Sequence, residues 1–302
     1  MNLHHRIKTK IKETSPETWL VACYLIFLSW MVLFYFNYVT LDLLFIFFFV
    51  AAFLLGLGSR YLKDWGPVLI AFLAYEALRG MAPHLNARVN ITNLIQLEHT
   101  LFGNTIPSTT LQNWLYTPGQ GGALNTIAAL LYSSHFYIYF LVAFILWYKK
   151  RELFLLFTRG FLLLTFAALL TYIIFPAMPP WMASTQGYLP KVHRIIFESW
   201  DDIFGTRKNI VLVYKYFEAN QIAAMPSLHA AWPFFTFLFL TYTFGKKWLP
   251  LIILPLGVGF SAIYLGEHYA IDVLAGYLYA TIAFLITAKV LKKRYIDTSP
   301  SS

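Results

Sequence analysis

Gly266-Glu267-His268-Tyr269-Ala270-Ile271-Asp272 and, earlier in the chain, Met225-Pro226-Ser227-Leu228-His229 are two short polar stretches that each open onto a long apolar run. Each stretch places a histidine where a membrane-facing segment begins. His268 and Asp272 are four residues apart, so on a helix they share a face, where the carboxylate can hold one imidazole nitrogen and fix the tautomer. Pro226 and Ser227 predict a helix start just before His229, where unpaired backbone N–H groups favour an anion. Together the two stretches indicate a phosphoryl-transfer site.

The composition excludes an ordinary soluble domain. Of the 302 residues, 59% are hydrophobic and only 12% are charged, whereas soluble proteins carry about 25% charged residues. The net charge of +9 is concentrated in short clusters at the ends of apolar runs, which is typical of cytosolic membrane loops and not of nucleic-acid binding. The single cysteine, Cys23, excludes an internal disulfide and a thiolate metal cluster.

The apolar runs predict an all-α integral membrane protein, a polytopic bundle of about eight transmembrane helices. We expect one membrane domain over residues 1–302, with a basic cytosolic tail at residues 1–18 and a loop with Arg60 and Lys63 after the second span. The predicted spans are Trp19 to Tyr38, Leu41 to Gly58, Pro67 to Leu78, Ala123 to Tyr148, Leu153 to Phe175, Leu228 to Phe244, Trp248 to Leu265 and Tyr269 to Leu291.

Two longer polar segments interrupt these spans. Residues 81–122 are amphipathic and rich in turn residues, which predicts one or two helices lying in the membrane interface; residues 176–225 form a second polar loop. Eight spans with both termini in the cytosol put most basic clusters inside. The same arrangement puts His229, His268 and both polar segments outside. We therefore expect a plasma (inner) membrane protein with its active site on the extracytoplasmic side.

The chemistry of these residue types suggests a role for each. Asp272 is costly at membrane depth unless it is paired, and His268 is the nearest partner. His268, made more nucleophilic by Asp272, can attack phosphorus and form a phosphohistidine. His229 can donate a proton to the leaving oxygen, while Ser227 and backbone N–H groups can stabilise the phosphate oxygens. Spacing alone leaves open which histidine attacks.

A phosphate site also needs fixed positive charge. Arg79, at the outer end of the third predicted span, is the first candidate and Arg194 is the second. The alternative for Arg79 is an ion pair with Glu76 at i, i+3. His135 is either a head-group ligand or a hydrogen-bonded core histidine.

The expected head-group or substrate pocket comprises His135, Glu76 and Trp181. By contrast, Glu98, His99 and His193 are expected at the surface or the membrane interface.

Two other functions use the same residues. His229, His268 and Asp272 could form a 2-His-1-carboxylate metal site, but the sequence has no HExxH helix or acidic cluster to accompany them. We therefore expect no metal or other cofactor. A transporter could relay protons through the His268–Asp272 pair, but it should show two related halves with broken helices, which the sequence lacks.

The chain resembles the type 2 phosphatidic acid phosphatase superfamily. Pro226-Ser227-Leu228-His229 matches its Pro-Ser-x-His motif. Ser261-Ala262, followed by His268 and Asp272, partly matches its Ser-Arg-(x5)-His-(x3)-Asp motif. The resemblance implies that His268 is the nucleophile, Asp272 its orienting carboxylate and His229 the acid for the leaving group, in a metal-independent reaction.

Within the superfamily, the chain is most similar to the inositol phosphorylceramide synthase-related branch. The similarity extends in order over about residues 75–276, a family-like catalytic region. The stretches that support it are Tyr75-Glu76-Ala77-Leu78-Arg79-Gly80, Leu101-Phe102-Gly103, Tyr132-Ser133-Ser134-His135-Phe136, Pro176-Ala177-Met178-Pro179-Pro180-Trp181 and Ala224-Met225-Pro226-Ser227-Leu228-His229-Ala230.

The branch resemblance implies a lipid phosphotransferase with a phosphatidylinositol-like phospholipid donor and a ceramide or diacylglycerol acceptor. The alternative is hydrolysis of phosphatidate or a polyprenyl diphosphate at the same site. Two departures from the superfamily pattern concern the phosphate charge. Ala262 replaces the arginine of the last motif, and the Lys-(x6)-Arg-Pro motif has no clean match, with Pro179-Pro180-Trp181 in its approximate place. Arg79 and Arg194 are therefore the candidates for that charge, and the oligomeric state stays open.

Overall fold

The computed structural model describes residues 19–20, 23–24, 26–27, 41–204 and 220–291. In these ranges the regular elements are helices, and the only strand-like features are two isolated bridges. The prediction of an all-α protein is therefore confirmed. The chain groups into two compact units, residues 1–67 and residues 68–302, which are described separately. The expectation of a single domain stays a prediction.

The first unit contains α3 (Leu41–Leu54) and the start of α4 (Gly58–Leu85). The loop expected around Arg60 and Lys63 is helical instead, which corrects the sequence prediction. Tyr61 and Trp65, one turn apart, are both buried, and the Tyr61 hydroxyl donates to the Phe45 carbonyl of α3 at 3.1 Å. The apolar face of α4 thus begins before the expected span Pro67 to Leu78. The first predicted span, Trp19 to Tyr38, lies mostly outside the described residues.

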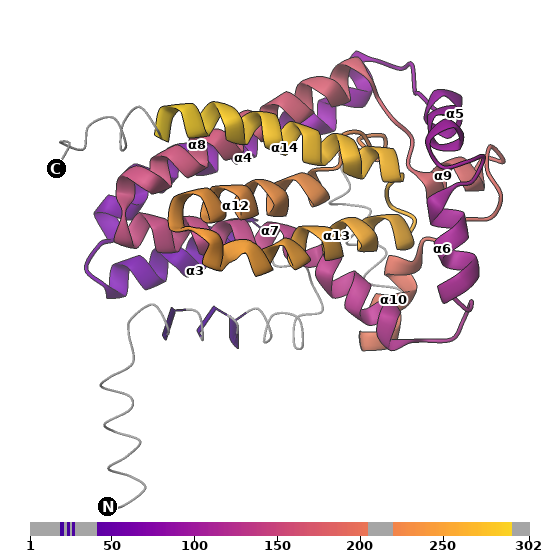
Figure 1. Ribbon diagram of the computed structural model, residues 1–302. Helices are drawn as coiled ribbons and strands as arrows, with labels where there is room; N and C mark the ends of the chain where they lie inside the picture. Colours follow the sequence, from indigo (N-terminus) through magenta and orange to yellow (C-terminus); the bar gives the residue numbers. More distant parts are fainter. Residues whose placement is uncertain (1–18, 21–22, 25, 28–40, 205–219, 292–302) are drawn as a thin grey trace, which may run out of the picture. The chain divides into compact units, whose positions relative to one another are not determined.

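The second unit is built around a helix bundle. Its long helices are α7 (Ala123–Lys149), α8 (Arg151–Ile174), α12 (Leu228–Phe244), α13 (Ile253–Tyr264, after the 3-10 helix Lys246–Ile252) and α14 (Ala270–Leu291). In the bundle, α12 packs against α7, α8, α13 and α14 (Figure 1).

Length and apolar composition identify membrane spans within this bundle. Among the described residues, four helical segments are long and apolar enough to cross a membrane: Ala123–Lys149, Arg151–Ile174, Lys246–Tyr264 and Ala270–Leu291. α12 has 17 residues and the same bounds as predicted. The chain is an integral membrane protein, while the total of eight spans stays a prediction.

Aromatic side chains fill the interior of the bundle. The rings of Tyr139 and Phe161 stack with their centroids 3.5 Å apart, and Phe161 lies 5.1 Å from Trp232 of α12. The Trp232 indole donates to the Thr165 hydroxyl at 3.1 Å, which satisfies its buried N–H. The core therefore fixes α7, α8 and α12 against one another directly below the site.

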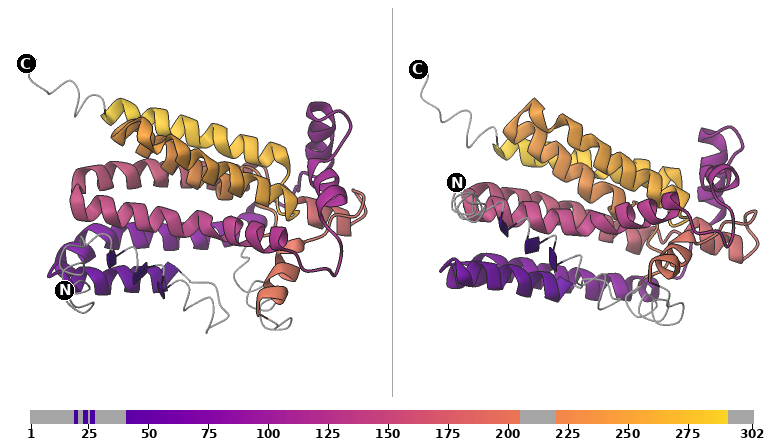
Figure 2. Two further views of the ribbon diagram at one scale, coloured as in Figure 1. Left: turned by 60° about the horizontal axis from the view of Figure 1, so that its bottom comes forward. Right: turned by 90° about the horizontal axis from the view of Figure 1, so that it is seen from below.

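Short helices close one end of the bundle and form a cap. The cap consists of α5 (Thr92–Leu101), α6 (Pro107–Leu115), α9 (Pro180–Thr185), α10 (Ile195–Phe204) and their connecting segments, gathered at one end in both views of Figure 2. Of the one or two helices expected within residues 81–122, two are present, α5 and α6, although α4 extends to Leu85. The cap has its own apolar core, formed by Leu94, Ile106, Ala177, Met178, Ala183, Leu189, Ala224, Tyr269 and Ile271.

The start of α12 and the start of α14 meet beneath this cap. The Ser227 N–H donates to the Asp272 carbonyl at 2.9 Å. A Cβ at Gly276 would lie 2.4 Å from the Ser227 carbonyl oxygen, so only glycine allows this approach. The Tyr172 hydroxyl, near the end of α8, donates to the Pro226 carbonyl at 2.8 Å. Three helices thus hold the two motif stretches side by side.

Candidate active site

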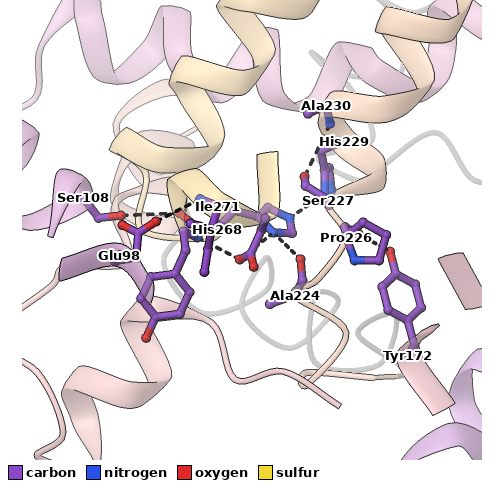
Figure 3. A network of polar contacts seen from close by, with 12 residues as sticks. Glu98, Ser108, Tyr172, Ala224, Pro226, Ser227, His229, Ala230, His268 and Ile271 are labelled. Carbon is purple, nitrogen blue, oxygen red and sulfur yellow. Dashed lines mark hydrogen bonds and ion pairs between the residues drawn. The ribbon is translucent and has the colours of Figure 1, made fainter. Parts of the chain in front are cut away.

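Two histidines that are 39 positions apart in the chain face each other at the cap end of the bundle. His229 Nδ1 lies 3.0 Å from His268 Nε2 (Figure 3). His229 belongs to the first turn of α12, and His268 lies in the short segment between α13 and α14. Because the two nitrogens are within hydrogen-bond distance, one of them carries a proton and the other accepts it.

The second ring nitrogen of His268 has two acceptors. His268 Nδ1 lies 2.9 Å from the Ala224 carbonyl oxygen and 3.6 Å from Asp272 Oδ2. The carboxylate of Asp272 is fully buried and also accepts the Tyr269 N–H at 2.8 Å. A carbonyl can only accept, so Nδ1 of His268 carries a proton, and in the neutral ring Nε2 is then the acceptor. The spacing of His268 and Asp272 predicted that the two side chains lie together, whereas nothing in the sequence pointed to the nearer Ala224 carbonyl.

Local sequence explains how each histidine is held. Ser227 is the N-cap of α12, and its buried hydroxyl oxygen accepts the Ala230 N–H at 3.4 Å. The Met225–Pro226 peptide bond before it is cis. Gly266, before His268, has a φ of +79° and its Cα faces the His193 carbonyl, which a Cβ would approach to 2.6 Å. The chain can turn there only with glycine.

His229 is enclosed by aromatic rings of α7. The Tyr132 ring stacks on it with centroids 4.1 Å apart, and the Tyr132 hydroxyl lies 3.4 Å from His229 Nδ1. The His135 ring lies 4.2 Å from the His229 ring, while His135 Nδ1 is bound to the Tyr132 carbonyl at 2.7 Å. The structure therefore brings His135 to the histidine pair, in a hydrogen-bonded setting.

The charge of Arg79 acts on His229 and Tyr172. Its guanidinium also binds Glu76, with Nη2 2.7 Å from Oε2. The side chain of Glu76 is about half exposed, so this pair is partly screened by solvent. The i, i+3 pair expected as the alternative for Arg79 is thus present, while its role in binding phosphate stays a prediction.

Arg194 has a different environment. Its Nε and Nη2 donate to the two carboxylate oxygens of Glu267 at 2.7 and 3.1 Å. Its guanidinium carbon lies 4.1 Å from the Trp181 ring centroid and 4.6 Å from that of Phe197. Arg194 and Trp181 therefore lie together beside Glu267, the residue before His268. This ion pair links the cap to the segment that carries His268.

The sequence prediction that Glu98 lies at the surface or the membrane interface is wrong. Its side chain is fully buried, and Oε1 accepts the Ile271 N–H at the start of α14 at 2.9 Å. Burial is the main cause that raises the pKa of Glu98 to about 7, and the nearby Asp272 charge adds to it. The sequence does hold a signal: Glu98 follows Leu94 by four residues, and Leu94 is in the apolar core of the cap.

Metal binding was the competing use of the histidines. In the part of the chain that the structure describes, no group of three or more His, Cys, Asp or Glu residues is arranged to hold a metal ion. His229 and His268 present ring nitrogens to each other at 3.0 Å, an arrangement that suits a shared proton.

The fold and the site define a class of protein: an all-α integral membrane enzyme with a histidine pair and a buried carboxylate at one end of its bundle. The family model described as the PAP2 superfamily matches residues 92–286, which contain this whole site except Arg79 and Glu76. The chain belongs to the PAP2 superfamily and is a lipid phosphotransferase or phosphatase of it.

Two characterised relatives belong to the expected branch. The phosphoinositol dihydroceramide synthase of Bacteroides thetaiotaomicron is 28% identical over 247 residues, which are 77% of this chain and 79% of the relative. The inositol phosphorylceramide synthase catalytic subunit aur1 of Schizosaccharomyces pombe is 26% identical over 204 residues, which are 64% of this chain and 46% of the relative. No solved structure matches the chain.

Proposed function

We propose that the chain moves a phosphoryl-bearing head group, inositol phosphate or a close analogue, from a phospholipid to a lipid alcohol through a phosphohistidine on His268. The observation that carries the proposal is the 3.0 Å approach of His229 Nδ1 to His268 Nε2. The similarity to the two synthases supports the choice of an inositol phospholipid as donor and a ceramide-like alcohol as acceptor.

The hydrogen bonds of His268 support a different role for each histidine of the pair. Since Nδ1 donates to Ala224, the unprotonated Nε2 is the nucleophile that attacks phosphorus. The proton between the two rings then belongs to His229 Nδ1, which therefore serves as the acid. The phosphate must enter between two nitrogens that are in contact here, so the rings separate when the donor binds.

The reaction proceeds in two balanced steps. In the first, a bond forms from His268 Nε2 to phosphorus, and the bond from phosphorus to the diacylglycerol oxygen breaks. His229, which enters this step as the imidazolium with a proton on each ring nitrogen, gives its Nδ1 proton to that oxygen and becomes neutral. In the second, His229 takes the proton of the acceptor hydroxyl, whose oxygen attacks phosphorus and releases His268. Asp272, 3.6 Å from His268 Nδ1, stabilises the positive charge that the ring carries between the steps.

Positive charge for the phosphate comes mainly from Arg79 in this proposal. Its charge reaches His229, and its partner Glu76 is about half exposed. Arg194 is held by both carboxylate oxygens of Glu267 and by two aromatic rings, so it contributes to the site through Glu267 and Trp181. Ser227, as the cap of α12, presents the first turn of that helix to the phosphate.

The test uses the purified protein in mixed micelles with phosphatidylinositol, with and without ceramide or diacylglycerol, and follows lipid products and free phosphate by mass spectrometry. Transfer of an intact phosphorylated head group to the added alcohol is the expected result. Free phosphate that is insensitive to the acceptor would instead establish a phosphatase. We expect EDTA to leave turnover intact; a loss that added metal restores would contradict the mechanism.

A further inference from the structure

The segment that carries His268 is held from outside the bundle by polar side chains of the cap. Gln112 Nε2 donates to the Tyr264 carbonyl at 2.9 Å, and the Ser108 hydroxyl donates to the carbonyl of His268 itself at 3.4 Å. Glu98 Oε1 accepts the Ile271 N–H at 2.9 Å. These contacts come from α5 and α6 and span the segment from the end of α13 to the first turn of α14. Figure 3 shows those of Ser108 and Glu98.

All three side chains are buried, and only Glu98 can carry a charge. The second carboxylate oxygen of Glu98 is buried without a hydrogen-bond partner among the described residues. Burying an ionisable group in this way is costly, so a specific interaction has to offset it. The start of α14 provides one, because its first N–H groups have no partner within the helix and carry partial positive charge.

The position of Glu98 relates it directly to the reacting groups. Ile271 precedes Asp272, whose Oδ2 accepts the Tyr269 N–H and lies 3.6 Å from His268 Nδ1. A shift of the Ile271 N–H therefore moves the carboxylate that faces His268. Glu98 itself bonds to backbone and has no contact with the imidazole.

We propose that Glu98 is a positioning residue, which fixes the first turn of α14 so that Asp272 and His268 keep the geometry needed for attack on phosphorus. This inference rests on the proposed role of His268 as the nucleophile. A glutamine at this position keeps the acceptor oxygen for Ile271 and removes the charge, whereas an aspartate keeps the charge and withdraws the oxygen by one methylene. The two variants separate position from charge.

The experiment compares Glu98→Gln, Glu98→Asp and Glu98→Ala with Gln96→Ala, an exposed side chain of the same helix. Turnover and KM for the phospholipid donor are measured per mole of folded, monodisperse protein. We expect Glu98→Ala and Glu98→Asp to lower kcat about 10- to 100-fold with KM within about 2-fold. Glu98→Gln should keep most of the turnover, and Gln96→Ala should match the original protein.

The ratio of the kcat of Glu98→Gln to the kcat of Glu98→Asp tests the inference even if Glu98→Ala does not fold. Turnover by Glu98→Asp equal to or above that of Glu98→Gln would overturn the inference, as would an unchanged kcat in Glu98→Ala. His268→Ala is assayed beside them. Full turnover there refutes the proposed function, whereas loss in His268→Ala with an unchanged kcat in Glu98→Ala and Glu98→Asp refutes only the positioning role.

Discussion

At the scale of single residues, the proton on His268 Nδ1 decides which nitrogen attacks phosphorus in the proposed mechanism. The Ala224 carbonyl oxygen, 2.9 Å from Nδ1, accepts the hydrogen bond from that proton. In the neutral ring, Nε2 therefore faces His229 as a base. We predict that His268→Ala and His229→Ala each lower turnover about 1,000-fold or more, because residues that act as a unit lose nearly all catalysis when either is removed. Turnover in the micelle assay and thermal unfolding of each variant provide the measurement.

A histidine away from the site is the matched control for this pair. His84→Ala removes an exposed imidazole in the last turn of α4 and should keep full turnover. Both site variants should remain folded, because His229 is only partly buried and His268 is not one of the residues that form the apolar core of the cap. Residual activity of more than a few per cent in both site variants would rule out the two-histidine mechanism.

The two candidate arginines should respond differently to truncation. Arg79→Ala removes charge near His229, so we predict about a 10- to 100-fold loss of kcat/KM for the donor with little change in thermal stability. Arg194→Ala leaves the carboxylate of Glu267, which is 7% exposed, without its guanidinium partner. Because a buried carboxylate without its partner is costly, this variant should lower the unfolding temperature more than Arg79→Ala does.

Kinetics and thermal unfolding, measured side by side on both arginine variants, distinguish these roles. The reverse pattern, with stability lost in Arg79→Ala and donor KM raised in Arg194→Ala at unchanged stability, would transfer the phosphate-binding role to Arg194. Arg79→Lys should keep part of the kcat/KM that Arg79→Ala loses, since lysine retains the charge but lacks the planar guanidinium group.

At the scale of helices, the site depends on how closely α12 and α14 approach each other. A Cβ at Gly276 would lie 2.4 Å from the Ser227 carbonyl oxygen, a backbone atom that cannot move aside alone. We predict that Gly276→Ala destabilises the protein by about 1–3 kcal/mol through overpacking. Turnover should also fall, because the start of α12 is displaced from Asp272. Thermal unfolding and the micelle assay are the two measurements.

Gly66→Ala is the control, because a Cβ there meets nothing within 4 Å and alanine is the better helix former. Its unfolding temperature should be equal to or above that of the original protein. If Gly276→Ala is equally well tolerated, the close approach of α12 and α14 is not required by the site.

The bounds of α12 were readable from the sequence because local signals set them, whereas α13 begins at Ile253, five residues after the predicted start at Trp248. Ser227 caps the start of α12 and Gly245 ends it, so the predicted and observed helix coincide. The partners of the motif residues were not readable in the same way. Ala224 contributes a carbonyl, which every residue has, and Glu98 contacts Ile271 from 173 positions away. Such contacts depend on tertiary packing, which periodicity does not encode.

The start of α4 shows that charged residues alone do not reliably predict a loop. Arg60 and Lys63 indicated a loop, yet Arg60 lies 3.9 Å from Asp64 one turn later, and the helix continues through both. The buried Tyr61 and Trp65, each next to a charged residue in the chain, have the helical spacing that outweighs the charges. Pairs of charges at i, i+4 are therefore as consistent with a helix as with a loop.

At the scale of the whole second unit, the two ends of the bundle differ in character. One end carries the cap and the histidine pair. The turn between α7 and α8 at the opposite end carries Lys149, Lys150 and Arg151, and Lys150 and Arg151 line a cavity there together with Tyr242, Thr243 and Leu291. Lys246 and Lys247 follow α12 at this end. We propose that the basic end is cytosolic and the site is extracytoplasmic, in the plasma (inner) membrane, because basic residues remain on the cytosolic side.

This orientation predicts which positions a membrane-impermeant maleimide can reach in intact cells. With Cys23 replaced by serine, a single Gly119→Cys before α7 should be labelled from outside. A single Lys150→Cys after α7 should be labelled only after permeabilisation. Both positions are exposed, and a 27-residue helix separates them, a distance of about 40 Å that spans the bilayer. The opposite labelling pattern would place the histidine pair in the cytosol and would require lipid substrates from the inner leaflet, while equal labelling of both positions before permeabilisation would show that α7 does not span the membrane.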